Sequence, residues 1–146
     1  EKLFANFKYL INDGYLKVAA KGYEVRYYPA QALIDRFERV RFNREAGADD
    51  LTAMREILSC DLLILDDLGA EFATAYSQSV LYQVINDRMN EGLATIIIIN
   101  LALPALSKAY NERILSRLIG SYTMLGFVGK DIRQQKLARA RGEVKG

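Results

Sequence analysis

Two unbroken apolar runs dominate the hydrophobic pattern of this chain. The first, Leu62–Leu65, ends at two carboxylates, and the second, Thr95–Ile99, ends at an amide. Neither run alternates between apolar and polar residues, which predicts strands that are buried on both faces, as in a parallel sheet. Between them, apolar residues recur at helical spacing over residues 76–91, and a glycine follows as a typical helix stop. The pattern therefore predicts a strand–helix–strand crossover.

Weaker periodicities continue this alternation on both sides. They predict a strand at 24–28, a helix over 31–41, a helix that Asp49 or Asp50 caps, a helix over 104–120 and a strand over 122–128. Alternating strands and helices indicate an α/β fold, a three-layer αβα sandwich with a mostly parallel sheet. We expect residues 1–146 to form a single domain.

Composition narrows the function. The chain has 146 residues, of which 51% are hydrophobic and 26% charged, with a net charge of +2, which excludes a disordered protein. The absence of histidine excludes histidine-based catalysis and histidine metal ligands, and Cys60 has no partner for an intrachain disulfide. No apolar run reaches the roughly 18–20 residues of a membrane span, so we expect a cytoplasmic protein. Because the chain begins at Glu1 rather than Met, we also expect it to be part of a longer protein.

The polar residues at the strand ends are the candidate site. Asp66 and Asp67 follow a buried strand, at the edge where open α/β sheets bind ligands. Asp66 could hold a Mg²⁺ ion, and Asp67 could orient or deprotonate an attacking water. A turn explains the same residues equally well. Asn100 would point toward the same site if the two strands are neighbours, although a cap or turn role is the alternative.

Two basic regions are further candidates. Arg113 and Arg117 are four residues apart and share one helix face. Either they lie on a solvated helix face, or the helix presents a guanidinium group to the nucleotide of a neighbouring subunit. The tail from Lys130 is basic and could contact nucleic acid phosphates, or it forms a solvated terminal helix. Cys60 is predicted to be a small buried hydrophobe.

Several segments together resemble the AAA+ ATPase domain of the DnaC/IstB group, which contains bacterial helicase loaders and transposition helper ATPases. The resemblance rests on DLLILDDLGAE at 61–71, TIIIINL at 95–101 and ERILSRLIG at 112–120, and on shorter matches at 21–30 and 129–133. It covers roughly residues 15–136 in the order of the family.

The resemblance implies a role for each site residue within an AAA+ P-loop NTPase fold. Asp66 would be the Walker B acid that binds Mg²⁺ and the nucleotide. Asp67 would be the catalytic acid and Asn100 the sensor-1 residue. Arg117 would be the arginine finger, which acts between adjacent subunits, and Arg133 would have a sensor-2-like part in nucleotide binding.

One motif of the family does not occur in these residues. The phosphate loop G-x-x-x-x-G-K-[ST] supplies backbone N–H groups, a lysine and a Mg²⁺-binding hydroxyl, and without it nucleotide affinity should collapse. Either the loop belongs between Glu1 and Tyr15 and is omitted from this sequence, or the protein is a degenerate relative that does not hydrolyse ATP. The retained acids, sensor asparagine and finger arginine favour the first explanation.

The function implied by the resemblance is an ATP-dependent helicase loader acting in DNA replication. Its cofactors would be ATP or ADP and Mg²⁺, and its partners a replicative DNA helicase and single-stranded DNA. Subunits would self-assemble through the nucleotide site, and no membrane is involved. The alternatives are a non-hydrolysing AAA+-like binding module and an IstB-like transposition helper ATPase. Loaders also carry an N-terminal partner-binding domain, which we expect to be missing from this chain.

Overall fold

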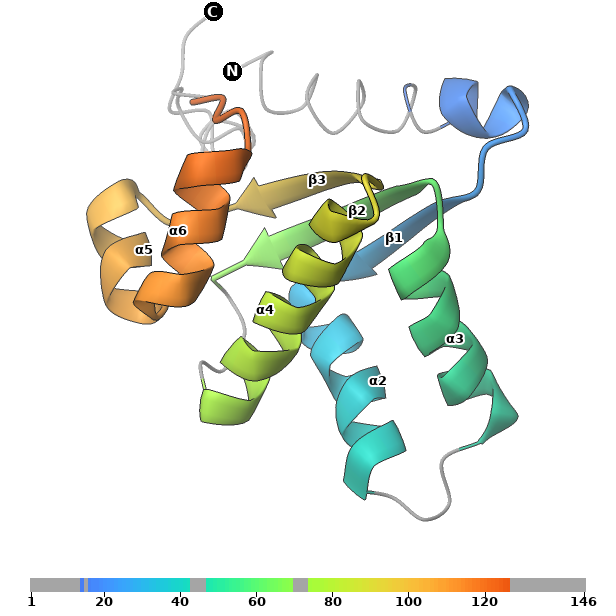
Figure 1. Cartoon of the computed structure of the whole chain (residues 1–146), viewed down its shortest axis with the longest axis horizontal. Helices are drawn as coiled ribbons and strands as arrows, with labels where there is room; N and C mark the ends of the chain where they lie inside the picture. The colour runs from blue at the N-terminus through green and yellow to red at the C-terminus, as the bar shows by residue number, and fades with distance from the viewer. Residues whose placement is uncertain (1–13, 15, 43–46, 70–73, 127–146) are drawn as a thin grey trace, which may run out of the picture. The chain divides into compact units, whose positions relative to one another are not determined.

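A three-stranded parallel sheet organises the part of the protein that the computed structural model describes, namely residues 14, 16–42, 47–69 and 74–126 (Figure 1). The chain divides into two compact units. The larger, Gly22–Thr123, contains the sheet and the helices that pack on it. The other combines residues 1–21 with residues 124–146, and within it residues 16–20 are helical.

The sheet has the strand order β1-β2-β3, with β1 at Val25–Pro29, β2 at Leu62–Leu68 and β3 at Ala94–Ile99. Both pairs are parallel, as the unbroken apolar runs predict. β2 is the central strand, and its residues 63–65 are at most 1% exposed. β3 differs from the prediction, because Ile96 is 39% exposed. The reason is topological, since β3 is an edge strand of the described sheet.

The helices of this unit are α2 (Ala30–Phe42), α3 (Ala48–Ser59), α4 (Ala75–Asn90), α5 (Leu103–Ala109) and α6 (Glu112–Ser121). In Figure 1, α2, α3 and α4 lie on one side of the sheet, whereas α5 and α6 lie beyond the arrowheads of β2 and β3. The apolar stripes of α2, α3, α4 and α6 meet Leu63 and Leu65 of β2 in one continuous core. No helix in the described ranges is long and apolar enough to cross a membrane.

The helix predicted between the two long strands is α4. Thr74 caps it, because its side chain accepts a hydrogen bond from the backbone N–H of Ser77 while the Ser77 hydroxyl receives one from Thr74. Gly92 follows the helix with a φ of +68°, a conformation that glycine adopts without a steric penalty.

The predicted cap of α3 is wrong. Gly47 occupies the N-cap position, and Asp49 and Asp50 lie in the first helical turn. The Asp50 carboxylate instead lies 3.1 Å from guanidinium nitrogens of both Arg36 and Arg39 on α2. The hydrogen bond from Arg39 lowers the pKa of Asp50. Asp50 therefore ties the end of α2 to the start of α3, which a local capping rule does not anticipate.

The helix predicted over 104–120 is two helices. The first helix, α5, ends before the buried residue Tyr110. The second helix, α6, begins after Asn111, whose side chain accepts a hydrogen bond from the backbone N–H of Ile114 at 3.1 Å. The strand predicted at 122–128 is also wrong within its described part, because residues 122–126 are irregular. The remainder, and the basic tail with Arg133, lie outside the described residues.

Arg88 is a fully buried cation that the sequence pattern did not reveal. Its guanidinium donates to the backbone carbonyls of Ile57 at 2.9 Å and Ala94 at 2.7 Å, and to the Thr95 hydroxyl at 3.0 Å. It also donates to Cys60, which is buried as predicted. One side chain on α4 thus joins the end of α3 to the start of β3.

We expect Arg88→Met to lower the free energy of unfolding by about 3 kcal/mol, because it leaves buried carbonyl oxygens without donors. Urea denaturation measures this change. Arg55→Met on the exposed face of α3 is the control, with an expected effect within about 0.5 kcal/mol. Equal stability of the two variants would show that the Arg88 network does not stabilise the fold.

Candidate functional site

The structure brings the predicted residues of β2 and β3 together, although Asp66 and Asp67 lie within β2, which continues to Leu68, rather than after it. Leu68 pairs with Ile99, and the backbone N–H of Asn100 donates to the carbonyl of Leu68 at 3.4 Å. A Cβ atom built on Gly69 would lie only 2.9 Å from the Asn100 side-chain oxygen. The two carboxylates and the asparagine therefore occupy the carboxyl edge of the sheet, where open α/β sheets bind ligands.

Asp66 is the buried member of this group, with 2% of its surface exposed. Its Oδ1 accepts a hydrogen bond from the backbone N–H of Asp67 at 2.8 Å, and its Oδ2 accepts one from the hydroxyl of Tyr27. This bond to Asp66 and the partial burial of the ring raise the pKa of Tyr27 to about 12. The phenol is therefore protonated at neutral pH and acts as a donor to the carboxylate.

Asp67 has a different environment. Its side chain is exposed, and its φ is +55°, in the left-handed region that Asp and Asn tolerate better than most residues. The pairing of β2 with β3 shifts register between Leu65 and Leu68, so the strand is irregular here. The environments of the two consecutive acids therefore differ, because Asp66 is buried and hydrogen-bonded whereas Asp67 is exposed to solvent.

Gly69 allows β2 and the segment after β3 to approach closely. Its φ is +103°, and an added Cβ would lie 2.6 Å from side-chain atoms of Leu101. Neither the backbone conformation nor the contact tolerates a larger residue. This glycine sets the spacing between the two carboxylates and Asn100.

We expect Gly69→Ala to destabilise the fold by about 1–3 kcal/mol and to displace the Asn100 side chain. Gly92→Ala is the matched control, because Gly92 also has a positive φ but has nothing within 4 Å of an added Cβ. Urea denaturation and the side-chain amide NMR signal of Asn100 measure the two effects. If both variants leave the Asn100 signal in place, the close approach does not position it.

The two arginines on α6 differ in their exposure. Arg113 is exposed and Arg117 is partly buried, on a helix that Ile114 and Leu118 anchor in the core. No hydrogen bond or ion pair connects Arg113 or Arg117 to a carboxylate within the described part of this single chain. Arg133 lies outside the described residues, so the structure does not place it.

The oxygen atoms that Asp66, Asp67 and Asn100 offer at this edge of the sheet are of the kind that binds a magnesium ion. Mg²⁺ in nucleotide sites is held by one or two carboxylates together with waters and phosphate oxygens, rather than by a cage of protein ligands. Within the described residues, no group of three or more His, Cys, Asp or Glu side chains is placed to hold a metal ion by itself. A carboxylate has about four lone-pair positions, and the hydrogen bonds from Tyr27 and from the backbone N–H of Asp67 use one on each oxygen of Asp66.

An aromatic and basic cluster lies elsewhere, where the end of α2 meets the start of α4. The rings of Phe42 and Tyr76 meet edge to face with centroids 5.2 Å apart. The guanidinium of Arg41 lies 5.3 Å from the Phe42 ring centroid and 5.1 Å from that of Tyr76. Phe42 is 64% exposed, so this group, called the Arg41 cluster below, presents an aromatic surface to solvent.

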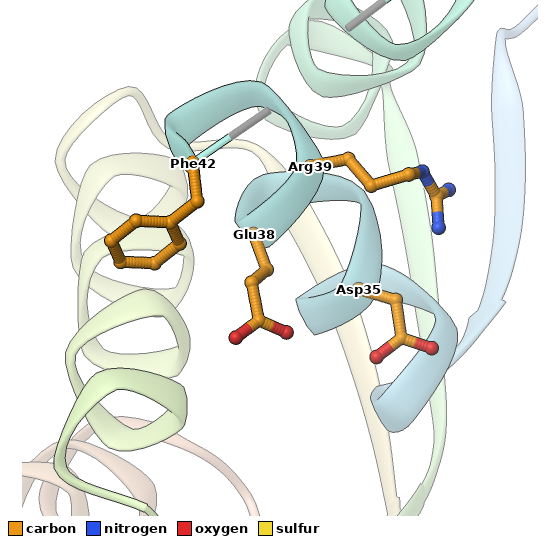
Figure 2. A pocket seen from close by; sticks show the side chains of 4 residues that line it. All are labelled: Asp35, Glu38, Arg39 and Phe42. Carbon is orange, nitrogen blue, oxygen red and sulfur yellow. The ribbon is translucent and has the colours of Figure 1, made fainter. Parts of the chain in front are cut away.

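A shallow pocket of about 490 Å³ lies along α2, next to Phe42. Figure 2 shows the side chains that line it, which are Asp35, Glu38, Arg39 and Phe42. Its two acids oppose the binding of a nucleotide phosphate there. None of the described residues that line the pocket is a predicted site residue.

The parallel sheet with acids and an asparagine at its carboxyl edge is an α/β arrangement of the kind that binds ligands at this edge. Residues 14–140 match the family described as IstB-like ATP binding protein, and the chain belongs to this family. The resemblance deduced from the sequence is therefore confirmed.

Known relatives agree with this assignment. The chain is 21% identical over 75 residues to the replicative helicase loader DnaC of Escherichia coli strain K12, a match that covers 51% of the chain and 31% of DnaC. The matched part is thus about a third of that relative's length.

Solved structures show the same fold. A crystal structure of the DnaC helicase loader superposes with a TM-score of 0.62 at 22% identity, covering 74% of this chain and 63% of that one. AMPPCP-bound DnaA from Aquifex aeolicus also gives 0.62, at 18% identity, covering 88% of this chain and 39% of DnaA. The predicted α/β fold of AAA+ type is confirmed by these likenesses.

Proposed function

We propose that the protein is an ATPase of the helicase-loader type, which acts in DNA replication on a replicative helicase and single-stranded DNA. The observation that carries this proposal is the convergence of Asp66, Asp67 and Asn100 at the carboxyl edge of the sheet. The family match supports ATP as the nucleotide, and the likeness to DnaC supports the partner class.

The environments of the three side chains support different tasks. Asp66 is buried and held by two donors, so it would hold Mg²⁺, which neutralises phosphate charge when bound. Asp67 is exposed on the same strand, so it would orient the attacking water or accept its proton. Asn100 would position that water or a phosphate oxygen through its side-chain amide.

Nucleotide titration of the full-length protein tests the proposal. We expect ATP to bind more tightly with Mg²⁺ than in EDTA, and Asp66→Asn to remove this difference. Asp49→Asn, which changes an exposed acid on α3, should behave as wild type. Failure of ATP to bind would favour the alternative of a non-hydrolysing binding module. An IstB-like transposition helper would instead bind and hydrolyse ATP but would stimulate a transposase rather than load a helicase.

The Arg41 cluster supports single-stranded DNA as a ligand. Stacking of a base on an aromatic ring contributes about 1–3 kcal/mol and is the main attraction here, because Asp35 and Glu38 beside Phe42 offset the attraction of Arg41 for the phosphate backbone. We expect Phe42→Ala to weaken binding of an oligothymidylate by about 5- to 150-fold, measured by fluorescence anisotropy. Leu51→Ala, at an exposed apolar residue of α3, is the control. Equal affinities would place the DNA surface elsewhere.

A further inference from the structure

Tyr27 lies on β1, the strand that pairs with β2 on the side opposite β3. Its backbone is opposite Ile64, and its side chain reaches the acid two positions further along β2. The hydroxyl donates to Oδ2 of Asp66 while the backbone N–H of Asp67 donates to Oδ1. Both carboxylate oxygens therefore have a donor, and the carboxylate plane is held in one orientation.

We propose that Tyr27 is a positioning residue of the candidate metal site, whose hydroxyl orients the Asp66 carboxylate and so strengthens its binding of a divalent cation. This inference rests on the proposed function, because Asp66 is the metal ligand there. Partners that hydrogen-bond to a metal ligand orient it before the metal arrives, and their removal typically weakens metal affinity by about 10- to 100-fold.

The burial of the two residues supports a positioning role over a packing role. The Tyr27 side chain is 47% exposed, so it contributes little to the core, whereas Asp66 is 2% exposed. Tyr27→Phe removes only the hydroxyl and keeps the ring. A loss of metal affinity in this variant would therefore report on the hydrogen bond and not on lost packing.

The experiment measures Mn²⁺ binding to the full-length protein with ADP present, by electron paramagnetic resonance of the free ion. We expect Tyr27→Phe to raise the Mn²⁺ dissociation constant by about 10-fold, the lower end of the range for such partners. Its ADP affinity in EDTA and its melting temperature should equal those of wild type. Tyr23→Phe, at an exposed tyrosine that precedes β1, is the matched control.

Two further results separate the failure of this inference from the failure of the proposed function. If Mn²⁺ binds and Asp66→Asn weakens it, but Tyr27→Phe binds it as tightly as wild type or more tightly, only the positioning role of Tyr27 is overturned. If wild type does not bind Mn²⁺, or if Asp66→Asn binds it normally, the metal site itself is wrong and the role of Tyr27 falls with it.

Discussion

We expect Asp67→Asn to slow ATP hydrolysis by the full-length protein by about 10²- to 10⁴-fold while it leaves ATP binding unchanged. An amide keeps the size and shape of the carboxylate but cannot accept a proton from water. Asp66 remains in place to hold Mg²⁺, so substrate affinity should persist. Turnover measured by phosphate release and affinity measured by titration separate the two effects.

The backbone at this position makes the substitution a clean test. Asp67 has a φ of +55°, and asparagine tolerates the left-handed conformation at least as well as aspartate. The side chain is exposed, so the change leaves no unpaired group in the core. Asp67→Ala would instead combine the loss of the carboxylate with backbone strain. Normal turnover in Asp67→Asn, as in the control Asp49→Asn, would remove Asp67 from the catalytic role.

The carboxyl edge of the sheet could be predicted because its signals are local. An apolar run that stops at a polar residue marks the end of β3 at Ile99–Asn100, and at Leu65–Asp66 it comes within three residues of the end of β2. Parallel strands then bring such ends to one edge whatever the detailed register. The position of the acids follows from these two facts, whereas the class of fold also needs the alternation of strands and helices along the chain.

Residues whose roles depend on distant partners could not be predicted. Tyr27 meets Asp66 across 39 positions of sequence, and only the register of β1 against β2 brings them together. Arg88 looks like a polar position on an amphipathic helix, yet its acceptors include the backbone carbonyls of Ile57 and Ala94. Every residue carries a carbonyl, so no sequence pattern distinguishes the two that need this donor.

The helix break at Tyr110–Asn111 is an intermediate case. Its signal is present in the sequence, because asparagine is a favoured N-cap residue. The apolar spacing from Leu106 to Leu118 is continuous and therefore hides this signal. The structure has two helices rather than one, with Tyr110 buried in the core at the point where they separate. The break places Arg113 and Arg117 on a helix separate from α5.

We expect Arg117→Ala to lower ATP turnover by about 10³-fold or more at protein concentrations where subunits assemble, because an arginine finger stabilises charge on the transferred phosphoryl group. Nucleotide binding by a single subunit should not change, since no interaction joins Arg117 to the acids of its own chain in the described residues. Arg113→Ala, one turn earlier on the same helix, is the matched control. If turnover falls in Arg113→Ala and not in Arg117→Ala, the finger is Arg113.

A mixture of two inactive variants tests whether Arg117 acts between subunits. In an assembly of Arg117→Ala and Asp67→Asn subunits, some interfaces join an intact Asp67 of one subunit to an intact Arg117 of its neighbour. Such interfaces contain a complete site, so turnover should reappear in the mixture although each variant alone lacks it. An arginine that acts within its own chain gives no recovery, because every subunit in the mixture then lacks one of the two groups. Recovery therefore depends on the geometry between subunits and not on the stability of either variant.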